Sequence, residues 1–154
     1  MSDDEFLAEA AAGIQKELST IADLRDELAR EMAKPEPGRR AIGSIIHDFY
    51  TCCERIFKRI AAEINGGTSG GDSWHKELLF RMTIPVEDRR PAVLSEGLAA
   101  DLDDYLSFRH VFRNIYGFEL QGERLSRLAS LLPAVSRRFE DEIRVFLGKL
   151  DAPH

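Results

Sequence analysis

The spacing of apolar residues constrains the fold of this chain most strongly, because they recur at intervals of three and four along most of its length. In the first long segment they are Leu7, Ala11, Ile14, Leu18, Ile21, Leu24 and Leu28. Such a repeat places these side chains on one face of an α-helix. No segment alternates apolar and polar residues with the period of two that is typical of a half-buried strand. The pattern therefore predicts an all-α protein.

The same repeat predicts five helices, at residues 4–34, 40–65, 73–82, 95–116 and 123–150. Connectors rich in proline and glycine separate them, and these residues favour turns. The second helix has the widest apolar stripe, which is typical of a helix with neighbours on several sides. Pro133 does not shift the phase of the last stripe, so we expect a kink there rather than a helix end. The predicted architecture is an up-and-down bundle of four long helices and one short helix.

Length and charge limit the functions open to this chain. Its 154 residues predict a single domain over residues 1–154. The residues after Met1 are acidic rather than apolar, so we expect neither a signal peptide nor a membrane partner, and a cytoplasmic protein. A net charge of −6 argues against binding DNA or other long nucleic acid along a basic surface. A small basic pocket that binds a few phosphates is still compatible with this net charge.

Cysteines and glycines, which often carry chemistry, give no such signal here. Cys52 and Cys53 are the only cysteines, and as neighbours they would form only a strained disulfide, so we interpret them as packing residues. The chain lacks the cysteine and histidine spacing of a zinc site, and we expect no metal and no cofactor. The glycine-rich residues 65–72 lack the Gly-Lys-Ser/Thr ending of a phosphate-binding loop.

Residues 105–117 place many polar side chains on a helix that is otherwise apolar. Burying a polar group without a partner costs about 1–3 kcal/mol, so this density indicates a site. The candidate residues are Arg109, His110, Arg113, Asn114 and Tyr116. Helical spacing puts Arg109 and Tyr116 on one face and His110 and Asn114 on the neighbouring face.

Residues on two other helices are further candidates for this site. His47 lies at the edge of the apolar stripe of the second helix, with Asp48 beside it, and is either a hydrogen-bonded core residue or a site residue. His75 opens the short helix and faces either solvent or a cleft. Its neighbour Trp74 is expected to cover the core.

The chain resembles the HEPN superfamily, specifically the HepT-like proteins. The similar segments are an acidic first helix, Ile46-His-Asp-Phe-Tyr50, Glu54-Arg-Ile-Phe-Lys-Arg-Ile60, Trp74-His-Lys-Glu-Leu-Leu79 and Phe108-Arg-His-Val-Phe-Arg-Asn-Ile-Tyr-Gly-Phe-Glu-Leu120. The resemblance covers nearly the whole chain. It implies a HEPN-like bundle that acts as the toxin of a toxin–antitoxin pair, with a minimal nucleotidyltransferase as antitoxin. It also implies a homodimer whose two motifs line one cleft.

The family motif is an arginine, four residues, a histidine, one residue and a tyrosine, and this chain departs from it. Arg109 and Tyr116 match the outer positions, whereas Asn114 stands where the histidine belongs. A second register begins at Arg113 and puts Phe118 and Leu120 at the other two positions. We prefer the first register because it matches more of the motif.

The resemblance implies metal-independent cleavage of RNA, in which the ribose 2′-hydroxyl attacks its own phosphate. An asparagine does not exchange protons as a histidine does, so His110, His47 or His75 would have to take over, and His110 lies one turn from Asn114. The resemblance also makes Tyr116 the residue that the partner modifies with AMP. Two alternatives stay open: a non-catalytic HEPN module that binds a nucleotidyltransferase or a nucleotide, and a helical dimer in which the polar cluster only joins helix ends.

Overall fold

The computed structural model describes residues 3–63, 74–114 and 122–151, and this part of the chain folds into five α-helices. They are α1 (Asp3–Met32), α2 (Arg39–Glu63), α3 (Trp74–Arg81), α4 (Glu96–Asn114) and α5 (Gly122–Asp151). The only β-structure among the described residues is an isolated bridge between Val86 and Arg90. The all-α fold class expected from the sequence is therefore confirmed. Each helix begins within one residue of its predicted start.

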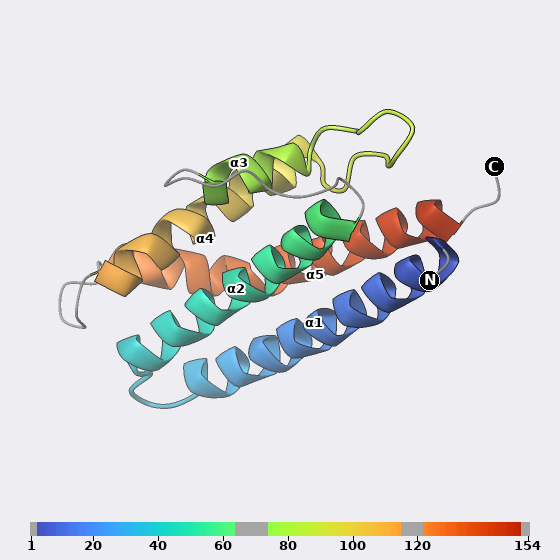
Figure 1. Ribbon diagram of the computed structural model, residues 1–154. Coiled ribbons are helices and arrows are strands. Elements are labelled where there is room, and N and C mark those ends of the chain that lie inside the picture. Colours follow the sequence, from blue (N-terminus) through green and yellow to red (C-terminus); the bar gives the residue numbers. More distant parts are fainter. Residues whose placement is uncertain (1–2, 64–73, 115–121, 152–154) are drawn as a thin grey trace.

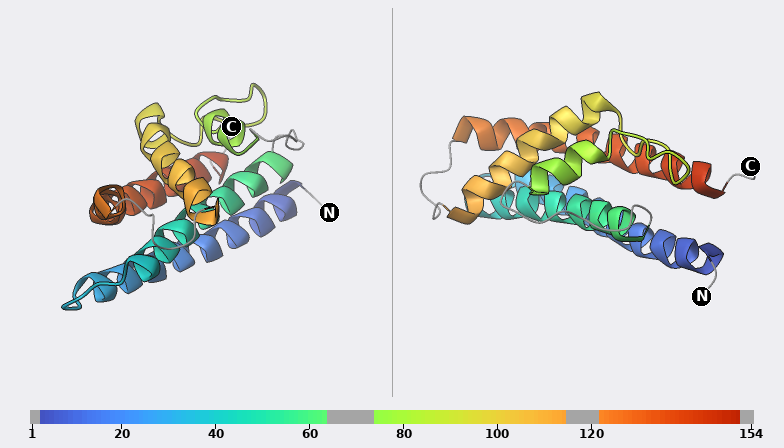
Figure 2. Two further views of the ribbon diagram at one scale, coloured as in Figure 1. Left: turned by 90° about the vertical axis from the view of Figure 1, so that its left-hand side faces the viewer. Right: turned by 45° about the horizontal axis from the view of Figure 1, so that its top comes forward.

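The long helices run up and down the bundle, and α2 lies at its centre (Figure 1). α2 contacts each of the other four helices, most extensively α1. The short helix α3 lies across α2 and α4, and the start of α1 and the end of α5 are at the same end of the molecule (Figure 2). Because its neighbours surround it, α2 has a wide apolar face, as its sequence predicts.

The hydrophobic core forms around α2. Phe49 packs edge to face against Tyr105 of α4, and Phe57 packs in the same way against Phe139 of α5. Such aromatic pairs contribute about 0.5–1.5 kcal/mol beyond the area that they bury. The apolar residues of α2 that are buried are Ile42, Ile45, Ile46, Phe49, Tyr50, Cys52, Cys53, Ile56, Phe57, Ile60 and Ala61.

Local contacts fix the ends of the helices. The Ser95 hydroxyl accepts a hydrogen bond from the Leu98 amide at 3.2 Å, which is an N-cap for α4. The buried Arg90 organises the α3–α4 connector by donating hydrogen bonds to the carbonyl oxygens of Arg81, Ile84 and Pro91. α5 continues through Pro133 as one helix from Gly122 to Asp151. These contacts define the start of α4 and join the end of α3 to the connector that leads to it.

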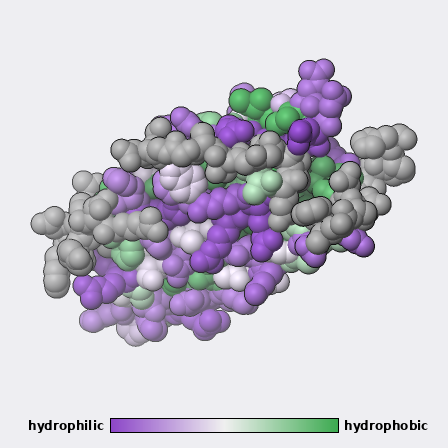
Figure 3. Space-filling model, viewed as in Figure 1, coloured by the Kyte–Doolittle hydropathy of each residue, from purple (hydrophilic) through white to green (hydrophobic). Residues whose placement is uncertain are grey.

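The surface that covers α2 and α3 is predominantly hydrophilic where the chain is described (Figure 3). None of the described helices is long and apolar enough to span a bilayer.

Candidate functional site

The described site is a cluster of polar side chains buried between α2, α3 and α4. Arg109 of α4 donates a hydrogen bond from Nη2 to Oε2 of Glu54 on α2, at 2.9 Å. The two side chains are only 4% and 5% exposed, so this is a buried ion pair. Nδ1 of His75 on α3 lies 2.7 Å from the same Oε2 atom. A single carboxylate oxygen therefore joins three helices.

The helices position these three residues through their apolar neighbours. Leu78 and Leu79 of α3 are buried in the core and lie three and four residues after His75, on the same helix face. Glu54 lies on the buried face of α2, one turn after Tyr50 and one turn before the buried Phe57. Arg109 follows the buried Phe108 on α4. Core packing of each helix thus carries one polar residue into the cluster.

Further side chains support the Arg109 guanidinium. The Tyr50 ring lies beneath it, 4.9 Å from ring centre to Cζ, which is a favourable cation–π distance. Thr51 Oγ1 lies 3.5 Å from Nη1, at the limit of a hydrogen bond, and itself donates to the His47 carbonyl oxygen. The guanidinium is therefore held by charge, by an aromatic face and by a hydroxyl.

At its outer edge the cluster meets solvent through His75, Trp74 and Lys58. The ring centroids of Trp74 and His75 are 3.7 Å apart, and Lys58 Nζ lies 4.6 Å from the centroid of the Trp74 ring. The same ammonium is 4.0 Å from Glu54 Oε1. His75 is 30% exposed, so its ring both contacts the buried carboxylate and is accessible from outside. Trp74 is half-buried against the core, in line with the expected cover.

Tyr50 is the one described residue with a buried side-chain polar atom that lacks a hydrogen-bond partner. Burial raises the pKa of its hydroxyl well above the usual value, and the nearby Cys53 and Glu54 raise it further. The phenol therefore stays protonated at neutral pH and cannot serve as a base. Its ring, by contrast, contributes directly to holding Arg109.

The sequence-predicted residues whose side chains the structure describes lie in three different places. The structure brings Arg109 and His75 together, with Nη2 and Nδ1 3.3 Å apart. His47 is half-buried, contacts the exposed Asp48 through Nδ1 at 3.2 Å and lies against Phe112, beside the cluster rather than in it. His110 is exposed on α4.

The remaining predicted residues lie at or beyond the end of α4. Arg113 and Asn114 belong to its last turn, and their side chains lie outside the described residues. The same holds for Tyr116, for the positions 118 and 120 of the second register, and for the glycine-rich loop.

Sequence reasoning missed Glu54, although the chain held a signal for it. Glu54 is an acid in the middle of the apolar stripe of α2, with Tyr50 four residues before it and Phe57 three residues after it on the same face. A carboxylate at such a position requires a buried cationic partner. Arg109 lies on a similarly apolar part of α4, and it is the cationic partner that Glu54 contacts.

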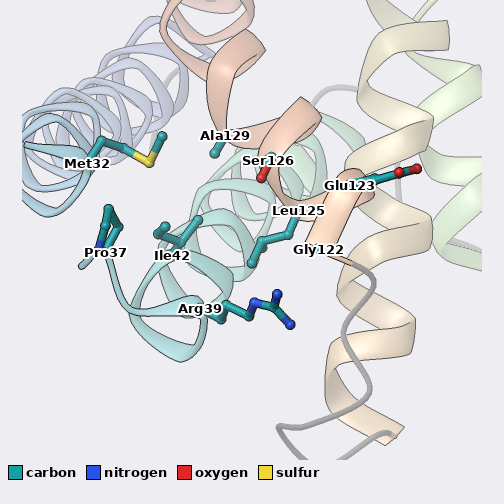
Figure 4. A pocket seen from close by; sticks show the side chains of 9 residues that line it. All are labelled: Met32, Pro37, Arg39, Ile42, Gly122, Glu123, Leu125, Ser126 and Ala129. Atoms are coloured by element: carbon teal, nitrogen blue, oxygen red, sulfur yellow. The ribbon is translucent and has the colours of Figure 1, made fainter. Parts of the chain in front are cut away.

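A separate cavity lies between the end of α1 and the starts of α2 and α5 (Figure 4). Its volume is about 690 Å³, and its walls are mainly apolar, with the Arg39 guanidinium at the edge. The lining residues are Met32, Pro37, Arg39, Ile42, Gly122, Glu123, Leu125, Ser126 and Ala129. None of the predicted site residues lines it.

Comparison with known proteins now places the chain in a class, the HEPN-type helical modules. A family model described as "HepT-like protein" matches residues 41–150. Since this match covers most of the chain, the protein belongs to the HepT-like family. The matched range begins in α2, so α1 lies outside it. Neither the curated proteins nor the solved structures contain a match.

Proposed function

We propose that this protein is the toxin component of a toxin–antitoxin pair and cleaves RNA without a metal ion. Membership of the HepT-like family supports the general assignment. The observation that carries the proposal is the buried Glu54–Arg109 ion pair with the accessible His75 attached to it. Two buried charges are seldom a better source of stability than apolar residues of the same size, because both must be desolvated. Because Arg109 of this pair is also the motif arginine, the pair favours a chemical purpose.

The proposed reaction needs a proton acceptor and a positive charge. The ribose 2′-hydroxyl attacks the adjacent phosphate, and arginine can stabilise the charge that develops on the phosphorane oxygens. Arg109 is already committed to Glu54, so we assign the phosphate contact to Arg113, one turn further along α4. Within this proposal His110 and Asn114 line the same end of the helix and contact the substrate.

Cleavage of a single-stranded RNA by the purified chain in EDTA tests this function. We expect products that end in a 2′,3′-cyclic phosphate and a 5′-hydroxyl, because the nucleophile belongs to the substrate. The matched control is a DNA oligonucleotide of the same sequence, which lacks the 2′-hydroxyl and must remain intact. Cleavage of both substrates, or of RNA only after a metal ion is added, would contradict the proposal.

Tyr116 is the proposed site of neutralisation. A nucleotidyltransferase partner would transfer AMP from ATP to its hydroxyl, with release of pyrophosphate and the hydroxyl proton. The added negative charge near the arginines would block phosphate binding. Mass spectrometry after incubation with partner and ATP should show AMP on the peptide that contains Tyr116. A Tyr116→Phe variant should stay unmodified, and equal modification of that variant would place the acceptor elsewhere.

A non-catalytic binding module is the second candidate, because Asn114 replaces the motif histidine. In that case the chain binds its nucleotidyltransferase partner or a nucleotide but leaves RNA intact. Intact RNA together with tight partner binding in titration calorimetry would favour this second function over the first.

A further inference from the structure

We propose that His75 is the general base of the ribonuclease reaction and that Glu54 positions its ring. This inference rests on the proposed function, and it assigns the proton transfer to a histidine outside the family motif. It follows from the contacts of Nδ1 of the imidazole, from the charges around Glu54 and from the surroundings of the other candidate bases.

The contact with Glu54 fixes which ring nitrogen carries the proton. Nδ1 lies 2.7 Å from the Glu54 carboxylate and 3.3 Å from Nη2 of Arg109. A carboxylate only accepts hydrogen bonds and a guanidinium only donates them. An unprotonated Nδ1 would face the carboxylate oxygen lone pair to lone pair at 2.7 Å, so we infer that Nδ1 is protonated and donates to Glu54. In the neutral imidazole Nε2 then carries the lone pair that a general base needs.

Two positive charges and the His75 ring surround the Glu54 carboxylate. Arg109 and Lys58 place two positive charges at 2.9 Å and 4.0 Å from its oxygens. The carboxylate that contacts Nδ1 can stabilise the imidazolium that forms when His75 accepts a proton. The Trp74 ring, 3.7 Å away, restricts rotation of the imidazole. His75 is thus oriented before any substrate binds.

The other candidate bases lie in different surroundings. His47 contacts the carboxylate of Asp48, which is 55% exposed and therefore gives a weaker electrostatic interaction. His110 lies on the exposed side of α4, next to Arg109 in sequence but turned about 100° away from it. Tyr50 remains protonated, and the Asn114 amide does not titrate.

The proposed reaction needs only the RNA, His75 and water. The 2′-oxygen forms a bond to phosphorus, and its proton passes to Nε2 of His75. The bond from phosphorus to the 5′-oxygen breaks, and water protonates the leaving oxygen. His75 then returns its proton to solvent, which regenerates the base and leaves a 2′,3′-cyclic phosphate.

Chemical rescue of His75→Ala tests the assignment. General acid–base catalysis contributes about 10²–10⁴-fold, so we expect a loss of that size in kcat. Free imidazole added to His75→Ala should restore part of the activity, because the small base can occupy the vacated space. A purely structural histidine would not respond in this way. The matched control is Lys76→Ala, which removes the exposed neighbour and should retain wild-type activity.

The ring tautomer gives a second readout that requires no active variant. Nitrogen NMR of the wild-type protein, with the His75 signal identified by its loss in His75→Ala, should show the Nδ1-protonated form of the neutral ring. The Nε2-protonated form would overturn the inference, as would full activity of His75→Ala or a loss that imidazole does not rescue. If the wild-type protein cleaves RNA and His75→Ala cleaves it equally well, this inference alone is refuted. Folded wild-type protein that leaves RNA intact refutes the proposed function as well.

Discussion

At the scale of the residue, Glu54 has the largest energetic consequences. Its carboxylate is the anionic partner of Arg109, and both are removed from solvent. Breaking a buried pair from one side leaves the other charge uncompensated, whereas replacing both with apolar residues is often neutral or stabilising. The cluster is therefore sensitive to single substitutions and tolerant of a paired one.

We expect Glu54→Ala to lower the free energy of unfolding by about 3–5 kcal/mol. The double variant Glu54→Leu with Arg109→Leu should recover most of that loss, because no buried charge remains. Urea unfolding followed by circular dichroism measures both. Asp101→Ala is the control, since its pair with Arg138 is exposed and should contribute no more than about 1 kcal/mol. Equal losses in the single and double variants would contradict this account.

The buried thiol of Cys52 makes the stability of the fold depend on pH. Burial, followed by the nearby Glu17, raises the pKa of its thiol from 9.0 to about 12. The folded chain thus holds this proton more tightly than the unfolded chain. The stabilisation is fully present below pH 9 and is lost as the pH rises towards 12.

Iodoacetamide at pH 8 should therefore label the native protein very slowly and the urea-unfolded protein rapidly. The urea midpoint should also fall as the pH rises above 9, the ordinary value of the thiol. Rapid labelling of native protein would show that the thiol is accessible.

At the scale of the element, the cap of α4 determines where the site-bearing helix begins. The Ser95 hydroxyl accepts a bond from the Leu98 amide and donates to Glu142 of α5. Its backbone amide donates to the other oxygen of Glu142 at 2.6 Å. One serine thus both starts α4 and joins it to α5.

We expect Ser95→Ala to lower stability by about 1 kcal/mol, the usual cost of removing an N-cap side chain. Ser107→Ala, in the exposed middle of the same helix, should leave stability unchanged or raise it slightly. Thermal unfolding of the two variants measures the difference. A larger loss in Ser107→Ala would mean that the hydroxyl of Ser95 does not cap the helix.

The helices could be predicted from sequence because apolar spacing and proline and glycine breaks act locally. The partners of Arg109 could not, since Glu54 and His75 lie 55 and 34 residues away along the chain. Helical spacing gives the face on which a side chain lies but not the helix that packs against it. A buried acid on α2 and an arginine on α4 suggest a pair only once the two helices are known to touch.

At the scale of the whole molecule, α2 is enclosed by the other four helices. The wide apolar face of this helix is not left for a second copy of the chain, because its apolar residues are buried by the other helices of the same chain. Among the described large hydrophobic residues, those left exposed on α5 are Leu131 and Val145. Homodimerisation stays a prediction, and light scattering that gives about twice 17.4 kDa would support it.

Growth of cells that express this chain alone is the most direct test of the proposed toxin function. Induction should arrest growth, and co-expression of the nucleotidyltransferase partner should restore it, because AMP on Tyr116 would block the site. His75→Ala, at the same soluble level, should no longer arrest growth. Normal growth while wild-type protein accumulates in soluble, folded form would contradict the assignment as a ribonuclease toxin.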